Sequence, residues 1–74
     1  MSHVDIVYDI LTAAQRPMHI DDIIAQAQRR FAIQLDKESI VSALTKRVKR
    51  QDRFIKTAPN TFALLAKNLE GGRQ

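Results

Sequence analysis

The residues with the clearest chemical potential form a run of cations in the second half of the chain. Six Lys and Arg side chains fall between residues 46 and 56, and a single acid, Asp52, lies among them. They are Lys46, Arg47, Lys49, Arg50, Arg53 and Lys56. This clustering is typical of a surface that binds a polyanion, and it is also compatible with a solvated helix face.

Catalytic and metal-binding combinations are weak in comparison. The chain has no cysteine, which excludes a thiol nucleophile, a disulfide framework and a zinc ribbon. His3 and His19 are the only imidazoles, and His19 with two neighbouring aspartates offers too few ligands for a metal, so we interpret His19 as a hydrogen-bonded turn residue. The sequence contains no convincing nucleophile, base and acid set and no phosphate-binding glycine loop. It predicts no catalytic residues, no cofactor and no metal.

Length and composition narrow the classes further. The 74 residues, 45% of them hydrophobic and 27% charged, are those of one small globular domain. A domain of this size has few apolar residues to spare for an enclosed substrate pocket, so a conventional enzyme is not expected. No apolar run approaches the roughly 20 residues of a membrane span, and the start does not resemble a signal peptide. We expect a cytoplasmic, nucleoid-associated or nuclear location.

The charge is divided unevenly along the chain. Residues 1–36 hold three basic and five acidic side chains, whereas residues 37–74 hold nine basic and three acidic ones. The net charge of +4 therefore belongs to the second half, where the cation run lies.

Two helices are predicted before the cation run. Apolar residues spaced by three and four positions predict the first helix over residues 3–15, with Ser2 as its N-cap and Pro17 ending it. Residues 18–20 are predicted to form one extended turn or a very short strand. Asp21 is predicted to cap the second helix, which has a buried side and ends at two arginines. That buried side comprises Ile20, acting as a staple onto Ile24, with Ile23, Ala27 and Phe31.

A third helix carries most of the cations. Asp36 is its predicted N-cap, it runs to about Gln51, and its apolar arc consists of Ile40, Val41, Leu44 and Val48. The side chains that point most directly away from this arc at 100° per residue are small at one end and cationic at the other. They are Ser39, Ser42, Ala43, Lys46, Lys49 and Arg50.

The remaining pattern is extended. Residues 53–57 and 61–65 are predicted to be strands joined by a turn at Pro59 and Asn60, and Phe54, Phe62 and Leu64 must pack this hairpin on the helices. The element order is that of a winged helix-turn-helix, a mainly α fold of the α+β kind. We expect the domain to cover residues 1–66, followed by a flexible tail or linker over residues 67–74.

Several separated motifs also resemble one known family, HARE-HTH. The resemblance covers roughly residues 3–65. It rests on Leu11, Arg16-Pro17-Met18-His19-Ile20-Asp21-Asp22-Ile23, Ser39, Ser42, Leu44, Val48, Arg53-Phe54-Ile55-Lys56 and Thr61-Phe62-Ala63-Leu64. Asn60 stands where the family's wing commonly has glycine, and asparagine tolerates the same positive φ. The resemblance implies a winged helix found in chromatin regulators, in restriction endonucleases and in the RNA polymerase delta subunit.

Combining the charge, the fold and the resemblance, we expect a module that binds duplex DNA. In this hypothesis Ser39, Ser42 and Ala43 approach base edges, whereas the cations meet the backbone. The predicted cationic contacts are Lys46, Lys49 and Arg50 on the helix and Arg53 and Lys56 on the wing. The module is expected to bring an attached or partner activity, such as a DNA-acting enzyme, to DNA. The alternative is a protein-interaction module that docks on RNA polymerase or on another transcription or chromatin complex.

Overall fold

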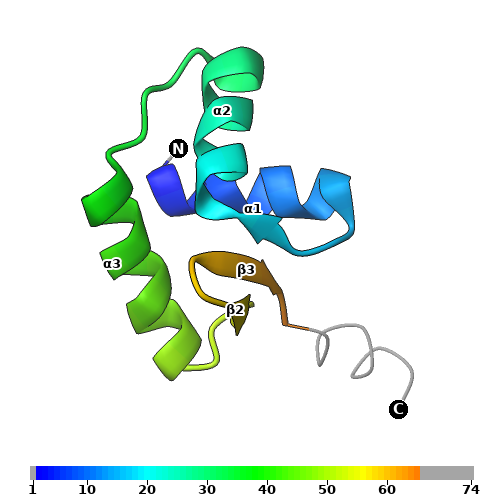
Figure 1. The fold of residues 1–74 in the computed structure, drawn as a ribbon, viewed down its shortest axis with the longest axis vertical. Coiled ribbons are helices and arrows are strands. Elements are labelled where there is room, and N and C mark those ends of the chain that lie inside the picture. Colours follow the sequence, from blue (N-terminus) through cyan, green and yellow to red (C-terminus); the bar gives the residue numbers. More distant parts are fainter. Residues whose placement is uncertain (1, 66–74) are drawn as a thin grey trace.

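A computed structural model describes residues 2–65, which form three helices and a three-stranded antiparallel sheet (Figure 1). The elements in chain order are α1 (His3–Ala14), β1 (Met18–His19), α2 (Ile20–Phe31), α3 (Lys37–Lys49), β2 (Phe54–Ala58) and β3 (Thr61–Leu64). This is the small α+β winged helix that the sequence predicts. The predicted tail over residues 67–74 lies outside the described residues.

Helix α1 begins at a complete capping box. The Ser2 side chain accepts a hydrogen bond from the Asp5 N–H at 3.2 Å, and the Asp5 carboxylate accepts one from the Ser2 N–H at 3.4 Å. Two N–H groups that have no partner within the helix are thereby satisfied. The predicted cap is confirmed, and the helix ends one residue before the predicted end, with Gln15 in the left-handed region at φ 57°.

The predicted cap of α2 is wrong, because His19 and not Asp21 occupies that position. The His19 Nδ1 accepts a hydrogen bond from the Asp21 N–H at 3.0 Å, and Asp21 lies within the first turn. The reason is a long-range pairing: β1 is held in register against β3, and the Ile20 N–H donates to the Asn60 carbonyl at 2.7 Å. The helix therefore starts directly after the strand, and Ile20 is a buried helical residue rather than a staple that precedes the cap.

Helix α3 has well-defined ends at both termini. The Asp36 carboxylate accepts a hydrogen bond from the Ser39 N–H at 2.9 Å, which confirms the predicted cap. The helix ends at Lys49, two residues before the predicted end. Beyond it Gln51 has φ 57°, and the Asp52 N–H donates to the Arg47 carbonyl at 2.9 Å. A left-handed residue followed by this backward bond is a Schellman ending, which fixes the direction of the chain leaving α3.

The predicted hairpin is confirmed and is extended by one strand. Strands β2 and β3 pair around the Pro59-Asn60 turn, in which Asn60 has φ 55°, and Phe54 lies opposite Leu64. Strand β1 pairs with the other edge of β3, with Met18 opposite Phe62. The strand order is therefore β1-β3-β2, and the third strand supports a hairpin that is marginal by itself.

One hydrophobic core joins the helices to the sheet. The side chains of Phe54 and Phe62 are fully buried, together with residues from all three helices. These include Val7, Ile10 and Leu11 of α1, Ile20, Ile23 and Ala27 of α2, and Ile40 and Leu44 of α3. Helix α1 contacts α2, α3 and β3, so it occupies the centre of this packing (Figure 1).

The left-handed conformation of Ala32 after α2 generates a stability prediction. Ala32 is exposed and has φ 55°, where a Cβ costs about 1 to 2 kcal/mol. Ala32→Gly is therefore expected to raise the free energy of unfolding by about 0.5 to 1 kcal/mol, since part of the gain is offset by the entropy of glycine in the unfolded chain. Urea unfolding followed by circular dichroism measures this change.

The matched control is Ala25→Gly, at an exposed position inside α2. There the same substitution should lower the free energy of unfolding by about 1 kcal/mol. Equal destabilisation by the two substitutions would contradict the assigned backbone conformation of Ala32.

Candidate nucleic-acid interface

The outward side of α3 carries the residues that the helical arithmetic selects. Five of them are exposed, namely Ser39, Ser42, Lys46, Lys49 and Arg50. Ala43 is half-buried, because it packs against the edge of the core. The opposite side of α3 is attached to the core by Ile40 and Leu44, which are buried. The helix therefore presents a polar and cationic surface away from the molecule's interior.

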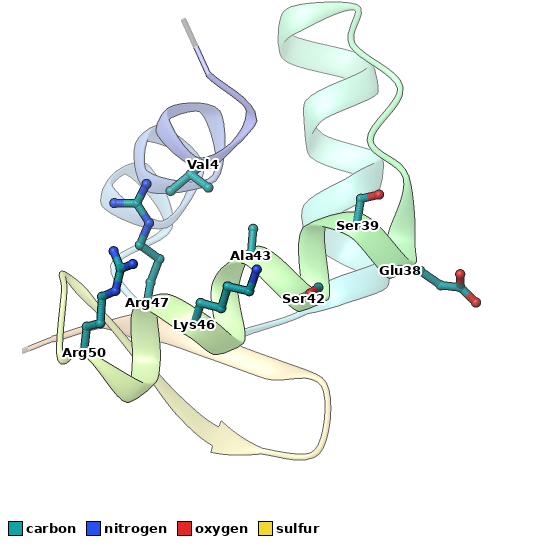
Figure 2. Close-up of a pocket in the computed structure, with 8 residues that line it drawn as sticks. All are labelled: Val4, Glu38, Ser39, Ser42, Ala43, Lys46, Arg47 and Arg50. Atoms are coloured by element: carbon teal, nitrogen blue, oxygen red, sulfur yellow. The ribbon is translucent and has the colours of Figure 1, made fainter.

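A shallow groove of about 540 Å³ lies between this surface and the first turn of α1 (Figure 2). Seven of the eight residues that line it belong to α3, and Val4 is the contribution of α1. The α3 residues are Glu38, Ser39, Ser42, Ala43, Lys46, Arg47 and Arg50. Four of the predicted helix contacts, together with Ala43, are thus brought together along one groove.

Arg47 is a groove residue that the helical arithmetic did not select. Its Nη1 donates a hydrogen bond to the Asp52 Oδ2 at 2.7 Å, and its side chain is 34% exposed. Figure 2 shows the side chains of Arg47 and Arg50 extending from α3 in the same general direction, toward the first turn of α1. The calculation measured the angle from the centre of the apolar arc, so it omitted a long side chain that leaves the flank of the helix beside α1.

Arg53 occupies a different environment from the cations of α3. Its Nη2 lies 3.7 Å from the Asp5 Oδ1, and its Nε lies 3.7 Å from the Asp52 Oδ1. The guanidinium also lies over the Tyr8 ring, 4.8 Å from the centroid, and 5.7 Å from the centroid of Phe54. We call Asp5, Tyr8, Asp52, Arg53 and Phe54 the Arg53 clamp, since together they connect α1 to the start of β2.

The clamp has a rigid aromatic base. The rings of Tyr8 and Phe54 meet edge to face, with centroids 6.2 Å apart and an interplanar angle of 89°. Arg53 itself has φ 72°, an uncommon conformation for a residue with a side chain, and it is only 32% exposed. The clamp thus holds α1 and the wing in a fixed relation on either side of Asp52.

The remaining two predicted contacts lie apart from the groove. Lys49 is exposed near the C-terminal end of α3 but does not line the groove. Lys56 is exposed on β2, whose outer half is solvent-facing. The structure therefore groups the predicted residues into three places: the groove, the end of α3, and the wing with its clamp.

Two carboxylates that cap helices have perturbed acidity. The backbone N–H and the side chain of Ser39 donate to Asp36 and lower its pKa below the ordinary value of 3.8. The pKa of Asp5 is lowered first by the hydrogen bonds from Ser2 and then by the positive charge of Arg53. Asp36 fixes the first turn of α3, and with it the direction of Ser39.

Three helices followed by a hairpin that packs beside the third helix define the molecule as a winged helix-turn-helix domain. The chain matches the profile of the HARE-HTH family, the helix-turn-helix domain described from ASXL and restriction endonucleases among others, over residues 1–66. It belongs to that family, which is generally DNA-binding and is not a catalytic family. The resemblance read from the sequence is thereby confirmed.

Neither the curated proteins nor the solved structures contain a match to this chain. Within residues 2–65, no helix combines the length and the apolar character that crossing a bilayer requires.

The lowered pKa of Asp36 predicts a specific pH dependence. Because its folded pKa lies below the value of 3.8 in the unfolded chain, the ionised carboxylate stabilises the fold above pH 3.8. This contribution is lost as the pH falls through the folded pKa. Asp36→Asn keeps an oxygen acceptor but removes the charge, so the variant should melt below the parent near pH 6, and the gap should close toward pH 2. A gap in melting temperature that stays constant or widens on acidification would contradict this role.

Proposed function

We propose that this domain binds duplex DNA, with α3 in the major groove and the wing on the neighbouring backbone. The observation that carries the proposal is the composition of the exposed side of α3. Short polar side chains, Ser39 and Ser42, occupy its first half, and cations occupy its second half, directly opposite the residues packed in the core. Membership of a DNA-binding helix-turn-helix family supports the same conclusion.

The dimensions and chemistry of α3 suit the major groove. An α-helix with its side chains is about 10 to 12 Å across, and the major groove of B-DNA is about 12 Å wide. Serine at positions 39 and 42 lets the helix axis approach base edges, and a hydroxyl can donate or accept there. The methyl group of Ala43 is suited to contact with a thymine methyl group.

The cations are distributed as phosphate contacts would be. Lys46, Lys49 and Arg50 are exposed on successive turns of α3, and Lys56 is exposed on the wing. Lysine and arginine at such positions neutralise backbone phosphates and fix the orientation of a protein on the duplex without reading sequence. In this proposal Arg53 contributes mainly through the clamp, and direct contact by Arg53 remains a prediction.

A domain of this kind would position an attached or partner activity on DNA. Docking on RNA polymerase or on a chromatin complex is the alternative function. A basic α3 favours DNA over that alternative, because a purely protein-docking surface does not require cations along the whole second half of the helix.

Substitution of Ser42 tests the proposal directly. Ser42→Glu places a carboxylate at the centre of the exposed side of α3, so it should weaken binding to a short duplex at least about tenfold through repulsion by phosphates. Glutamate is well tolerated at an exposed helical position, so the melting temperature should change little. Fluorescence anisotropy with labelled duplex DNA at low salt measures the affinity.

Ala25→Glu is the matched control, since it adds the same charge to an exposed position of α2. It should weaken binding only slightly. Equal losses from the two substitutions would mean that net charge alone governs binding. A parent protein that fails to bind duplex DNA even at low salt would refute the proposal and favour a protein partner.

A further inference from the structure

The side of the groove next to α1 has a concentrated positive charge that the proposed function does not yet explain. Arg47 and Arg50 are three positions apart on α3 and are therefore neighbours on its surface. Both line the groove together with Lys46, whereas Val4 and Ala43 supply apolar atoms to it. Among the described residues that line the groove only Glu38 is acidic, and Figure 2 shows its side chain directed away from the two arginines.

Arg47 is held in place before any ligand arrives. Its side chain donates to the Asp52 carboxylate at 2.7 Å, and its carbonyl accepts from the Asp52 N–H at 2.9 Å. The Schellman ending of α3 thus fixes the backbone of Asp52, and the ion pair fixes the guanidinium. An arginine that is ordered in advance loses less conformational entropy when it binds.

Asp52 is itself braced from the other side. Its Oδ1 lies 3.7 Å from the Arg53 Nε, and Arg53 is fixed by Asp5 and by the Tyr8 ring. The carboxylate is 36% exposed, so it is partly withdrawn from solvent. The position of the Arg47 guanidinium is therefore coupled, through Asp52, to α1 and to the start of the wing.

The donors that Arg47 has left can bind an anion. A guanidinium has five N–H donors in a planar fork, and the hydrogen bond to Asp52 is made through Nη1. Two such forks on adjacent turns match the tetrahedral oxygens of a phosphate. An arginine held by a carboxylate behind it can present its remaining edge in one direction.

We propose that Arg47 and Arg50 form a site for one backbone phosphate in the groove between α3 and the first turn of α1, and that Asp52 is a positioning residue for Arg47. The proposal rests on the proposed function and deepens it. It assigns one DNA strand to the side of α3 that faces α1, and it gives an acidic residue a favourable role in an interface with a polyanion.

The role of Asp52 predicts an effect of unusual sign. An acid near DNA that has no other role repels phosphates, so its removal should tighten binding. If Asp52 positions Arg47, then Asp52→Ala should instead weaken binding to a short duplex about fivefold, on the order of the net contribution of one hydrogen bond. The sign of the change therefore separates positioning from simple electrostatics.

The experiment compares three variants by fluorescence anisotropy with a 15-base-pair duplex. Arg47→Lys keeps the charge but loses the planar fork, so binding should weaken about fivefold while the dependence on salt changes little. The double variant Arg47→Lys with Asp52→Ala should bind about as well as Arg47→Lys alone, because the two residues act as one unit. Arg29→Lys, on the exposed side of α2, is the control and should have no effect.

Tighter binding by Asp52→Ala would overturn the positioning role, and unchanged binding by Arg47→Lys would overturn the phosphate site. Either result leaves the proposed function in place if Ser42→Glu still prevents binding. A parent protein that does not bind the duplex overturns both. Thermal melting identifies a folding defect in Asp52→Ala, in which case Arg47→Lys decides the phosphate site.

Discussion

The burial of Phe54 and Phe62 is the constraint on which the rest of the structure depends. Both side chains are fully buried, and they come from the two strands of a hairpin that has little stability alone. Once these rings enter the core formed by α1, α2 and α3, β3 is fixed centrally in the sheet and β1 can pair with it. That pairing in turn sets where α2 begins, since the Ile20 N–H bonds to the Asn60 carbonyl.

The same packing determines what α3 offers to solvent. Its apolar side is occupied by the core, so its small and cationic residues must face outward, with one flank beside α1. The Arg53 clamp then connects α1 to the wing through Tyr8 and Asp5 on one side and Asp52 on the other. A domain with a single small core thereby holds its helix, its groove and its wing as one unit, and rigid support of this kind is what a binding surface requires.

The sequence predicted the features that are determined locally. The Ser2 and Asp36 caps, the burial of Ile40 and Leu44, and the hairpin at Asn60 follow from spacing and turn chemistry over a few residues. The His19 cap could not be predicted in this way, because it results from pairing between β1 and β3, which are about 40 residues apart. The direction of Arg47 and the withdrawal of Arg53 into the clamp likewise depend on partners in other elements. Contact of the outward residues with DNA remains a prediction.

The most direct test of the central claim is a two-dimensional ¹⁵N–¹H NMR titration of the domain with a short DNA duplex. The account predicts that the largest shifts occur in residues 39–50 of α3, with further shifts at Val4 and around Asp52, whereas residues 24–30 of α2 change little. Shifts concentrated on α2, with α3 unaffected, would contradict the assignment of α3 as the helix that meets DNA.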